Sequence, residues 1–241
     1  MQVLDRPQWK TIQGGSRVYV QRLLRSLQDV RLSSPVQRVT RDDSGVTVHS
    51  RHGVERFDQL VLGCHSDQAL ALLADASPAE VDVLSRLRYQ PNRAVLHTDA
   101  SFLPQRQSAW AAWNYRVGRA GVSDAPVMVS YLLNTLQQLP FRQPVIVTLN
   151  PYREPAGVLA EFDYAHPVFD SDAIAAQHAL HAIQGRQRTW FAGAWAGYGF
   201  HEDGLKAGML VAQQLGARIP WDCSVPLAEH RPLPQLAGAG A

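Results

Sequence analysis

The sequence predicts an α+β fold, in which an α/β layer is interrupted by an antiparallel-sheet domain with helices. Two short apolar runs, 60–62 and 189–192, each end at a glycine, which is typical of strands buried on both faces of a parallel sheet. The stretches 36–57 and 93–164 instead contain short alternating runs separated by turn residues, which indicates antiparallel strands. A helix is expected after each buried strand, so the layer should follow a strand–glycine–helix order.

The composition favours a globular protein and argues against several other classes. Of the 241 residues, 46% are apolar, which is enough for one large domain or two small ones with a sizeable core. The 23 basic and 21 acidic residues give a formal charge of +2, and the basic residues are spread along the chain, so nucleic-acid binding gains no support. Cys64 and Cys223 form no C-x-x-C pair, which favours a reducing compartment.

The sequence also lacks the signals of membrane insertion and secretion. No apolar stretch approaches the roughly 20 residues that a membrane span needs. The N-terminus has no charged segment followed by an apolar one. We therefore expect a cytoplasmic protein without an integral membrane segment.

The first part of the chain is predicted to contain a helix, a small antiparallel meander and the first strand of the layer. Gly14 and Gly15 form a turn that opens a helix over 16–28, with Ser16 as its cap and apolar residues on one face. Strands are expected at 30–32, 36–39, 46–48, 54–57 and 60–63, followed by a helix at 66–74.

From about residue 78 the pattern changes to that of a separate antiparallel-sheet domain. A helix begins at Pro78, and strand-like segments follow between loops rich in Pro, Gly, Asp and Gln. The strands are expected near 93–98, 108–115, 126–133, 144–149 and 157–164. Helices are then expected at 171–184 and 203–215, with a strand at 189–193 between them.

The stretch 190–208 carries the most specific chemical signal. A strand ends at Gly193, a glycine-spaced loop follows, and a helix then points its free N–H groups and its positive dipole end back at the loop. Such a loop suits an electron-rich group. His201, Glu202 and Asp203 have no second ligand pair at helical spacing, so no metal site is predicted, and the two carboxylates are interpreted as favourable charges at a helix N-terminus.

This stretch resembles the closing flavin-binding motif of the amine oxidase superfamily, a strand ending in F-A-G, a glycine–aromatic loop and a helix start with E-G and A-G. Upstream, 9–16, 36–39 and 58–64 resemble the family's G-G–helix, V-x-x-V and D-x-V-(I/L)-x-(A/C) motifs in order and spacing. Up to about Pro220, the chain is similar to the C-terminal part of bacterial predicted NAD/FAD-binding proteins of the flavin-containing amine oxidase and phytoene desaturase superfamily. The matching positions of the closing motif are Gly193, Gly199, Phe200, Glu202, Ala207 and Gly208.

The resemblance implies an FAD-dependent oxidoreductase that transfers hydride to the flavin from a carbon centre of a small-molecule substrate. An apolar cavity lined by tryptophans would favour a lipid-like or isoprenoid substrate over a charged amine. It also implies a discontinuous FAD-binding portion over 1–75 and 186–220, a substrate domain over 76–185 and a flexible tail over 221–241. Val36 would contact the adenine through its backbone, whereas catalytic residues and oligomeric state stay open. The implied cofactor-binding residues are Val36, Gly193, Ala194, Trp195, Gly199, Phe200, His201, Glu202 and Asp203, and Trp113, Tyr198 and Phe200 are expected to face the substrate.

Three departures from the family pattern add a second expectation. Ala194 and Trp195 stand where the family usually has an acidic residue. No lysine occurs between Lys10 and Lys206, whereas many amine oxidases hold one near the flavin. The opening strand–G-x-G-x-x-G–helix, which binds the FAD pyrophosphate, is absent. The first two departures argue against a true amine oxidase, and the third predicts a fragment cut off upstream. The alternative to an enzyme is a catalytically inactive truncated fragment or a partner-requiring half.

Overall fold

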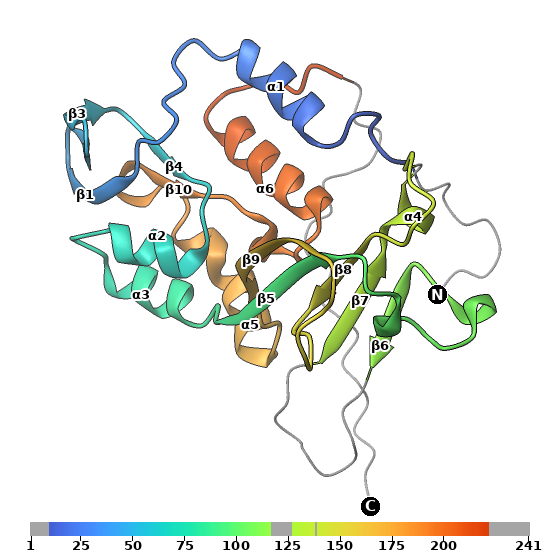
Figure 1. Cartoon of the computed structure of the whole chain (residues 1–241). Coiled ribbons are helices and arrows are strands. Elements are labelled where there is room, and N and C mark those ends of the chain that lie inside the picture. Colours follow the sequence, from blue (N-terminus) through green and yellow to red (C-terminus); the bar gives the residue numbers. More distant parts are fainter. Residues whose placement is uncertain (1–9, 117–126, 138, 222–241) are drawn as a thin grey trace, which may run out of the picture. The chain divides into compact units, whose positions relative to one another are not determined.

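The computed structural model describes residues 10–116, 127–137 and 139–221, and it confirms an α+β fold (Figure 1). The chain divides into two compact units. The unit that we call the layer unit comprises 33–90 and the residues from 167 onward. The unit that we call the five-stranded unit comprises the residues up to 32 together with 91–166.

An antiparallel three-stranded meander, in the order β1-β2-β3, opens the layer unit. Its first hairpin turns after Asp42, whose Oδ1 accepts the N–H of Ser44 at 2.8 Å, a local turn that Asp favours. The strands expected between 36 and 57 therefore form, whereas the expected strand at 30–32 does not. There the chain turns at once, because Ser33 has a φ of +53°. The strands are β1 (Val36–Asp42), β2 (Gly45–Ser50) and β3 (Gly53–Phe57).

Two short parallel strands, β4 (Leu60–Leu62) and β10 (Thr189–Phe191), form the layer itself. The ladder continues past β10, because the N–H of Ala192 donates to the carbonyl of Leu62 at 3.0 Å. Phe191 is fully buried, but Val61 is 45% exposed. The two strands thus lie where the sequence predicted them. The prediction that both faces of β4 are buried was wrong, because Val61 is exposed among the described residues.

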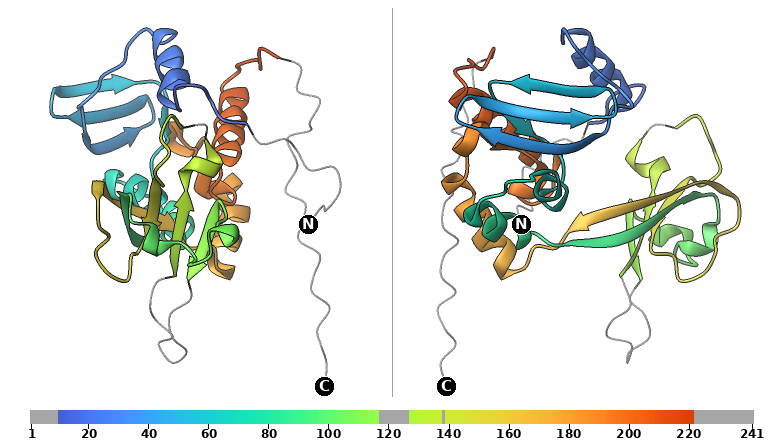
Figure 2. Two further views of the ribbon diagram at one scale, coloured as in Figure 1. Left: turned by 45° about the vertical axis from the view of Figure 1, so that its right-hand side comes forward. Right: turned by 90° about the vertical axis from the view of Figure 1, so that its left-hand side faces the viewer.

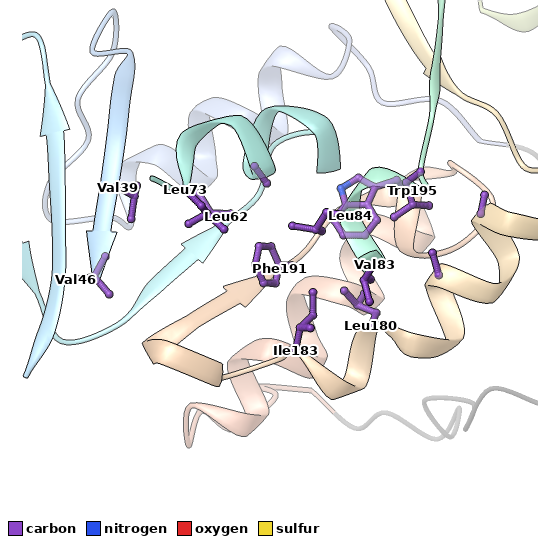
Figure 3. Packing of buried hydrophobic residues seen from close by; sticks show 14 residues of the cluster. Val39, Val46, Leu62, Leu73, Val83, Leu84, Leu180, Ile183, Phe191 and Trp195 are labelled. Atoms are coloured by element: carbon purple, nitrogen blue, oxygen red, sulfur yellow. The ribbon is translucent and has the colours of Figure 1, made fainter. Parts of the chain in front are cut away.

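Three helices surround this strand pair and share one apolar core with it (Figure 3). Phe191 lies in the middle of the cluster, with Leu62, Leu84, Ile183 and Trp195 from four other segments around it. Because these side chains come from both halves of the chain, the core ties β4 to β10 across more than a hundred residues of sequence. The helices are α2 (Ser66–Leu72), α3 (Pro78–Ser85) and α5 (Ser171–Ala179).

A buried ion pair joins the meander to α3. Arg41 donates to Glu80 at 2.6 Å, and both side chains are inaccessible to solvent. Arg41 also donates to Asp75 at 2.9 Å, and Glu80 accepts the N–H of Ser77 at 2.8 Å in a capping box. Every hydrogen-bonding group of this pair therefore has partners, as a buried charge requires.

The five-stranded unit is an antiparallel sheet in the order β6-β7-β8-β5-β9. Figure 2 shows β5 and β9 as long adjacent strands of this sheet. The expected sheet is confirmed, but the expected strand at 108–115 starts only at Trp113, because 107–109 forms a 3-10 turn. The elements are α1 (Arg17–Arg25), β5 (Tyr89–His97), β6 (Trp113–Arg116), β7 (Met128–Leu132), α4 (Leu133–Leu136), β8 (Ile146–Leu149) and β9 (Val158–Pro167).

The compact units divide the chain differently from the predicted portions 1–75 with 186–220 and 76–185. Helices α3 and α5 fall in the predicted substrate domain, yet they belong to the layer unit because Leu84 and Ala176 lie in its core. Conversely, α1 groups with the five-stranded unit. Of the predicted tail 221–241, all but Trp221 lies outside the described residues.

Candidate functional site

The loop between β10 and α6 (His201–Gln214) is anchored by Trp195. Its indole is 3% exposed, and Nε1–H donates to the carbonyl of Cys64, just beyond β4, at 3.0 Å. A Cβ at Gly193 would lie 2.4 Å from this indole nitrogen. Gly193 is therefore required so that the ring can fold back under the loop and tie it to the end of the neighbouring strand.

Two glutamines hold the backbone on either side of this anchor. Gln177 of α5 donates through Nε2 to the carbonyls of Trp195 (2.8 Å) and Gly197 (2.7 Å). Gln184 accepts the N–H of Phe191 at 2.8 Å and donates to its carbonyl at 2.7 Å. Because Gln177 holds the carbonyls of Trp195 and Gly197, hydrogen bonds within the protein fix this part of the loop.

Asp203, in the first turn of α6, closes the other end of the loop. Its Oδ2 accepts the N–H groups of Tyr198 and Phe200, each at 3.0 Å. A Cβ at Gly197 would lie 2.6 Å from this carboxylate, and Gly199 has a φ of +85°, a conformation that favours glycine. The glycine spacing seen in the sequence thus serves a self-capped turn.

The N-terminus of α6 leaves backbone donors for a ligand. Asp203 uses the N–H of Phe200, while the N–H groups of His201 and Glu202 belong to the first turn, where a helix offers no acceptor of its own. The 14-residue helix places its positive dipole end at the same point. This end of the loop is therefore suited to an electron-rich or anionic group.

The structure brings most of the predicted cofactor-binding residues into this one loop and helix start. Tyr198 and Phe200 are 60% and 68% exposed, and the ring of Phe169 lies edge-on to Tyr198 at 6.4 Å. Trp195 is instead a core residue, so only its backbone is available to a ligand. The predicted residues that share the segment are Gly193, Ala194, Trp195, Tyr198, Gly199, Phe200, His201, Glu202 and Asp203.

Val36 lies apart from this loop, at the beginning of β1. β1 is an edge strand, and its pairing with β2 is irregular between Val36 and Arg38. Such a bulge leaves backbone groups out of the ladder. This is consistent with a contact made by the backbone rather than by the side chain.

Trp113 belongs to the five-stranded unit and lines a cavity of about 1500 Å³ within it. Its side chain is 46% exposed. Lys10 and the Gly14–Gly15 turn line the same cavity, together with residues of α4. The sequence pointed to Trp113 but not to its neighbours, because positions about 100 residues apart share no local pattern.

No group of three or more His, Cys, Asp or Glu among the described residues could hold a metal ion. None of the helices in the described part of the chain is long and apolar enough to cross a membrane.

A parallel strand pair leads into a glycine loop and a helix N-terminus, and an antiparallel sheet interrupts this layer in the sequence. The fold is thus an α+β class in which the loop and helix start can receive an anionic or electron-rich group. The profile of the family described as flavin containing amine oxidoreductase matches residues 3–216. The chain belongs to this family. No curated protein matches it.

Solved structures share the fold at low sequence identity. The CLA-producing fatty acid isomerase from P. acnes is 16% identical with a TM-score of 0.60, and the match covers 84% of this chain and 52% of that one. Reduced UDP-galactopyranose mutase is 10% identical with a TM-score of 0.59, and the match covers 84% of this chain and 52% of that one. Putrescine oxidase bound to putrescine is 14% identical with a TM-score of 0.55, and the match covers 85% of this chain and 53% of that one. The chain thus spans about half the length of the structures it matches.

Proposed function

We propose that this chain provides the flavin-facing part of an FAD-dependent oxidoreductase that removes hydride from a carbon centre of its substrate. The observation that carries the proposal is the loop 193–203, whose backbone is held by Gln177 and Asp203 and leads directly into the first-turn N–H groups of α6. Family membership supports the flavin. When bound, the flavin would supply the redox chemistry itself, and the protein would supply binding and orientation.

The residues of the loop suit the flavin end of the cofactor. The N1–C2=O edge of an isoalloxazine is electron-rich and becomes negatively charged on reduction, so the N–H groups of His201 and Glu202 would stabilise it. The backbone of Ala194 and Trp195 would face the ribityl chain, and that of Val36 the adenine. The printed sequence contains no G-x-G-x-x-G, so these residues account for the flavin and adenine ends and not for the pyrophosphate.

The five-stranded unit would hold the substrate. Its cavity of about 1500 Å³ exceeds the usual range for small-ligand pockets, and Trp113 forms part of its wall. The apolar part of this wall, with Trp113, Leu136 and Leu139, suits a lipid-like or isoprenoid substrate better than a small amine. The fatty acid isomerase among the similar structures acts, by its name, on a substrate of that kind.

A single proline substitution at the start of α6 tests the flavin assignment. Proline is tolerated at the first position of a helix, and Phe200 before it has φ −86° and ψ 159°, which a following proline accepts. His201→Pro therefore removes one N–H while keeping the helix, and His201→Ala is the matched control. We expect FAD, followed by quenching of its fluorescence, to bind the wild type and the alanine variant, and to bind the proline variant about tenfold more weakly. A wild-type chain that leaves FAD fluorescence unchanged would refute the proposal for this chain.

A second candidate, a partner-requiring half without activity of its own, is favoured by uncovered apolar surface in the layer unit. In α6 only Val211 is buried, whereas Leu205 and Leu210 are 50% and 43% exposed. A hollow of about 380 Å³ also runs along this helix, with Gly204 and Gly208 in its wall. Light scattering on the purified chain distinguishes the candidates. A chain that scatters as a monomer and binds one FAD would exclude the partner-requiring half. A chain that aggregates, or that stays colourless when FAD is added, would favour the partner-requiring half.

A further inference from the structure

We infer that the cavity of the five-stranded unit binds an apolar carboxylate, with Lys10 as the partner of the carboxylate group. This inference names the substrate class for the proposed function, and it depends on that function only for the step from cavity ligand to substrate. Lys10, Ile12 and Gln13 line the cavity together with Trp113 and residues of α4.

The charge of the wall selects the sign of the ligand. Among the described residues that line the cavity, Lys10 is the only one with a formal charge, and neither Asp nor Glu occurs. An anion would find a counter-ion there, whereas a cationic amine would find none and would meet a like charge. The family name suggests an amine, so the wall itself argues for a different substrate class.

Apolar side chains make up part of the rest of the wall, beside its threonines, glutamines and Asn134, and would contact the hydrocarbon body of the ligand. Ile12, Ala112, Trp113, Leu136 and Leu139 supply apolar surface. Trp113 is 46% exposed, so a large part of its surface is available to a ligand. Apolar surface of this kind is the main source of binding free energy for a hydrocarbon chain.

One amide in the wall already has its partners inside the protein. Asn134 donates to the carbonyls of Phe141 (3.2 Å) and Gln143 (3.1 Å), and it accepts the N–H of Val145 at 2.7 Å. It therefore holds its own loop in place and contributes little to recognition. Polar recognition falls to Lys10 and to the side chains of Thr11, Gln13, Thr135 and Gln137.

Three probes of equal chain length separate charge from hydrophobicity: laurate, dodecanol and dodecylamine, each titrated calorimetrically below the concentration at which it forms micelles. We expect laurate to bind about tenfold more tightly than dodecanol, and dodecylamine to bind most weakly. In Lys10→Gln the preference for laurate should vanish, and Lys10→Arg should restore it. Lys206→Gln is the matched control, because Lys206 pairs with Glu202 on α6 at 3.6 Å and does not line the cavity.

A second pair of variants places the apolar chain. Trp113→Ala should weaken laurate and dodecanol to a similar degree, whereas Tyr115→Ala, two residues further along β6 and outside the wall, should not. Equal binding of the three probes, an unchanged laurate preference in Lys10→Gln, or no binding at all would overturn the inference. Because no titration contains FAD, a chain that binds laurate through Lys10 but binds no flavin would refute only the proposed function.

Discussion

The carboxylate of Asp203 occupies the space that a side chain on Gly197 would need, since a Cβ there would lie 2.6 Å from it. The same carboxylate accepts two N–H groups of the loop. The glycine and the aspartate are therefore one device: the glycine leaves room for the cap, and the cap fixes the loop whose next helix offers its N–H groups to a ligand.

The first prediction follows from this contact. Gly197→Ala should destabilise the chain by about 1–3 kcal/mol, because the new methyl group must displace the Asp203 carboxylate. Gly208→Ala, inside α6 with nothing within 4 Å of the new Cβ, should instead stabilise the chain by about 0.5–1 kcal/mol through helix propensity. Urea unfolding followed by circular dichroism measures both changes. Equal stability of the two variants would contradict the role given to the cap.

The second prediction concerns the anchor of the loop. Trp195→Phe keeps most of the buried ring but leaves the carbonyl of Cys64 without its donor, so we expect a loss of about 1–3 kcal/mol. Trp190→Phe is the matched control, because the Trp190 indole donates to the side chain of Gln59 and that amide can turn to water instead. The control should lose less than half as much in the same urea titration.

The local part of this site could be predicted from the sequence. The pattern is contiguous in sequence: it contains Gly193, Gly199 and the helix that begins near Asp203. Each glycine indicates a backbone conformation or close contact at its own position. The short apolar runs before Gly63 and Gly193 likewise located the two layer strands. In such segments the chain's immediate neighbours decide the structure.

The distant part could not be predicted, for a physical reason. The hydrogen bond from Trp195 to the carbonyl of Cys64 joins residues 131 positions apart, and neither residue type predicts it. Gln177, which holds two loop carbonyls, looks in sequence like any polar residue of an alanine-rich helix. The cavity shared by Lys10 and Trp113 is likewise visible only once the chain has folded.

The third prediction concerns the buried pair of Arg41 and Glu80. Burial raises the pKa of Glu80, but hydrogen bonds from Arg41 and Ser77 outweigh it and leave the pKa below its ordinary value of 4.5. Because the folded pKa is the lower one, this stabilisation is complete above about pH 4.5 and is lost as the pH falls further. Glu80→Gln should cost about 1–3 kcal/mol at pH 7, since it removes one of the two carboxylates that pair with buried Arg41 and leaves Asp75 as the remaining counter-ion.

The control for this pair is an exposed one. Glu154 pairs with Arg93 at 2.6 Å but is 72% exposed, so Glu154→Gln should cost less than about 1 kcal/mol. Denaturant titrations at pH 7 and pH 4 compare the two variants with the wild type. A Glu80→Gln variant as stable as Glu154→Gln would show that the buried pair contributes nothing beyond a surface one.

The last prediction concerns His97, which is fully buried in the five-stranded sheet. Its ring bonds Thr148 Oγ1 at 2.8 Å through Nε2 and accepts the N–H of Asp99 at 3.1 Å through Nδ1. Burial lowers its pKa below 6.5, and nearby Arg153 acts in the same direction against Asp99. The unfolded chain therefore binds a proton more readily, so the free energy of unfolding should fall as the pH drops below about 6.5, by at most about 1.4 kcal/mol per pH unit. His97→Gln, which can still donate to Thr148, should flatten this slope in urea titrations between pH 7 and pH 5. A slope that persists in His97→Gln would mean that another group titrates on unfolding.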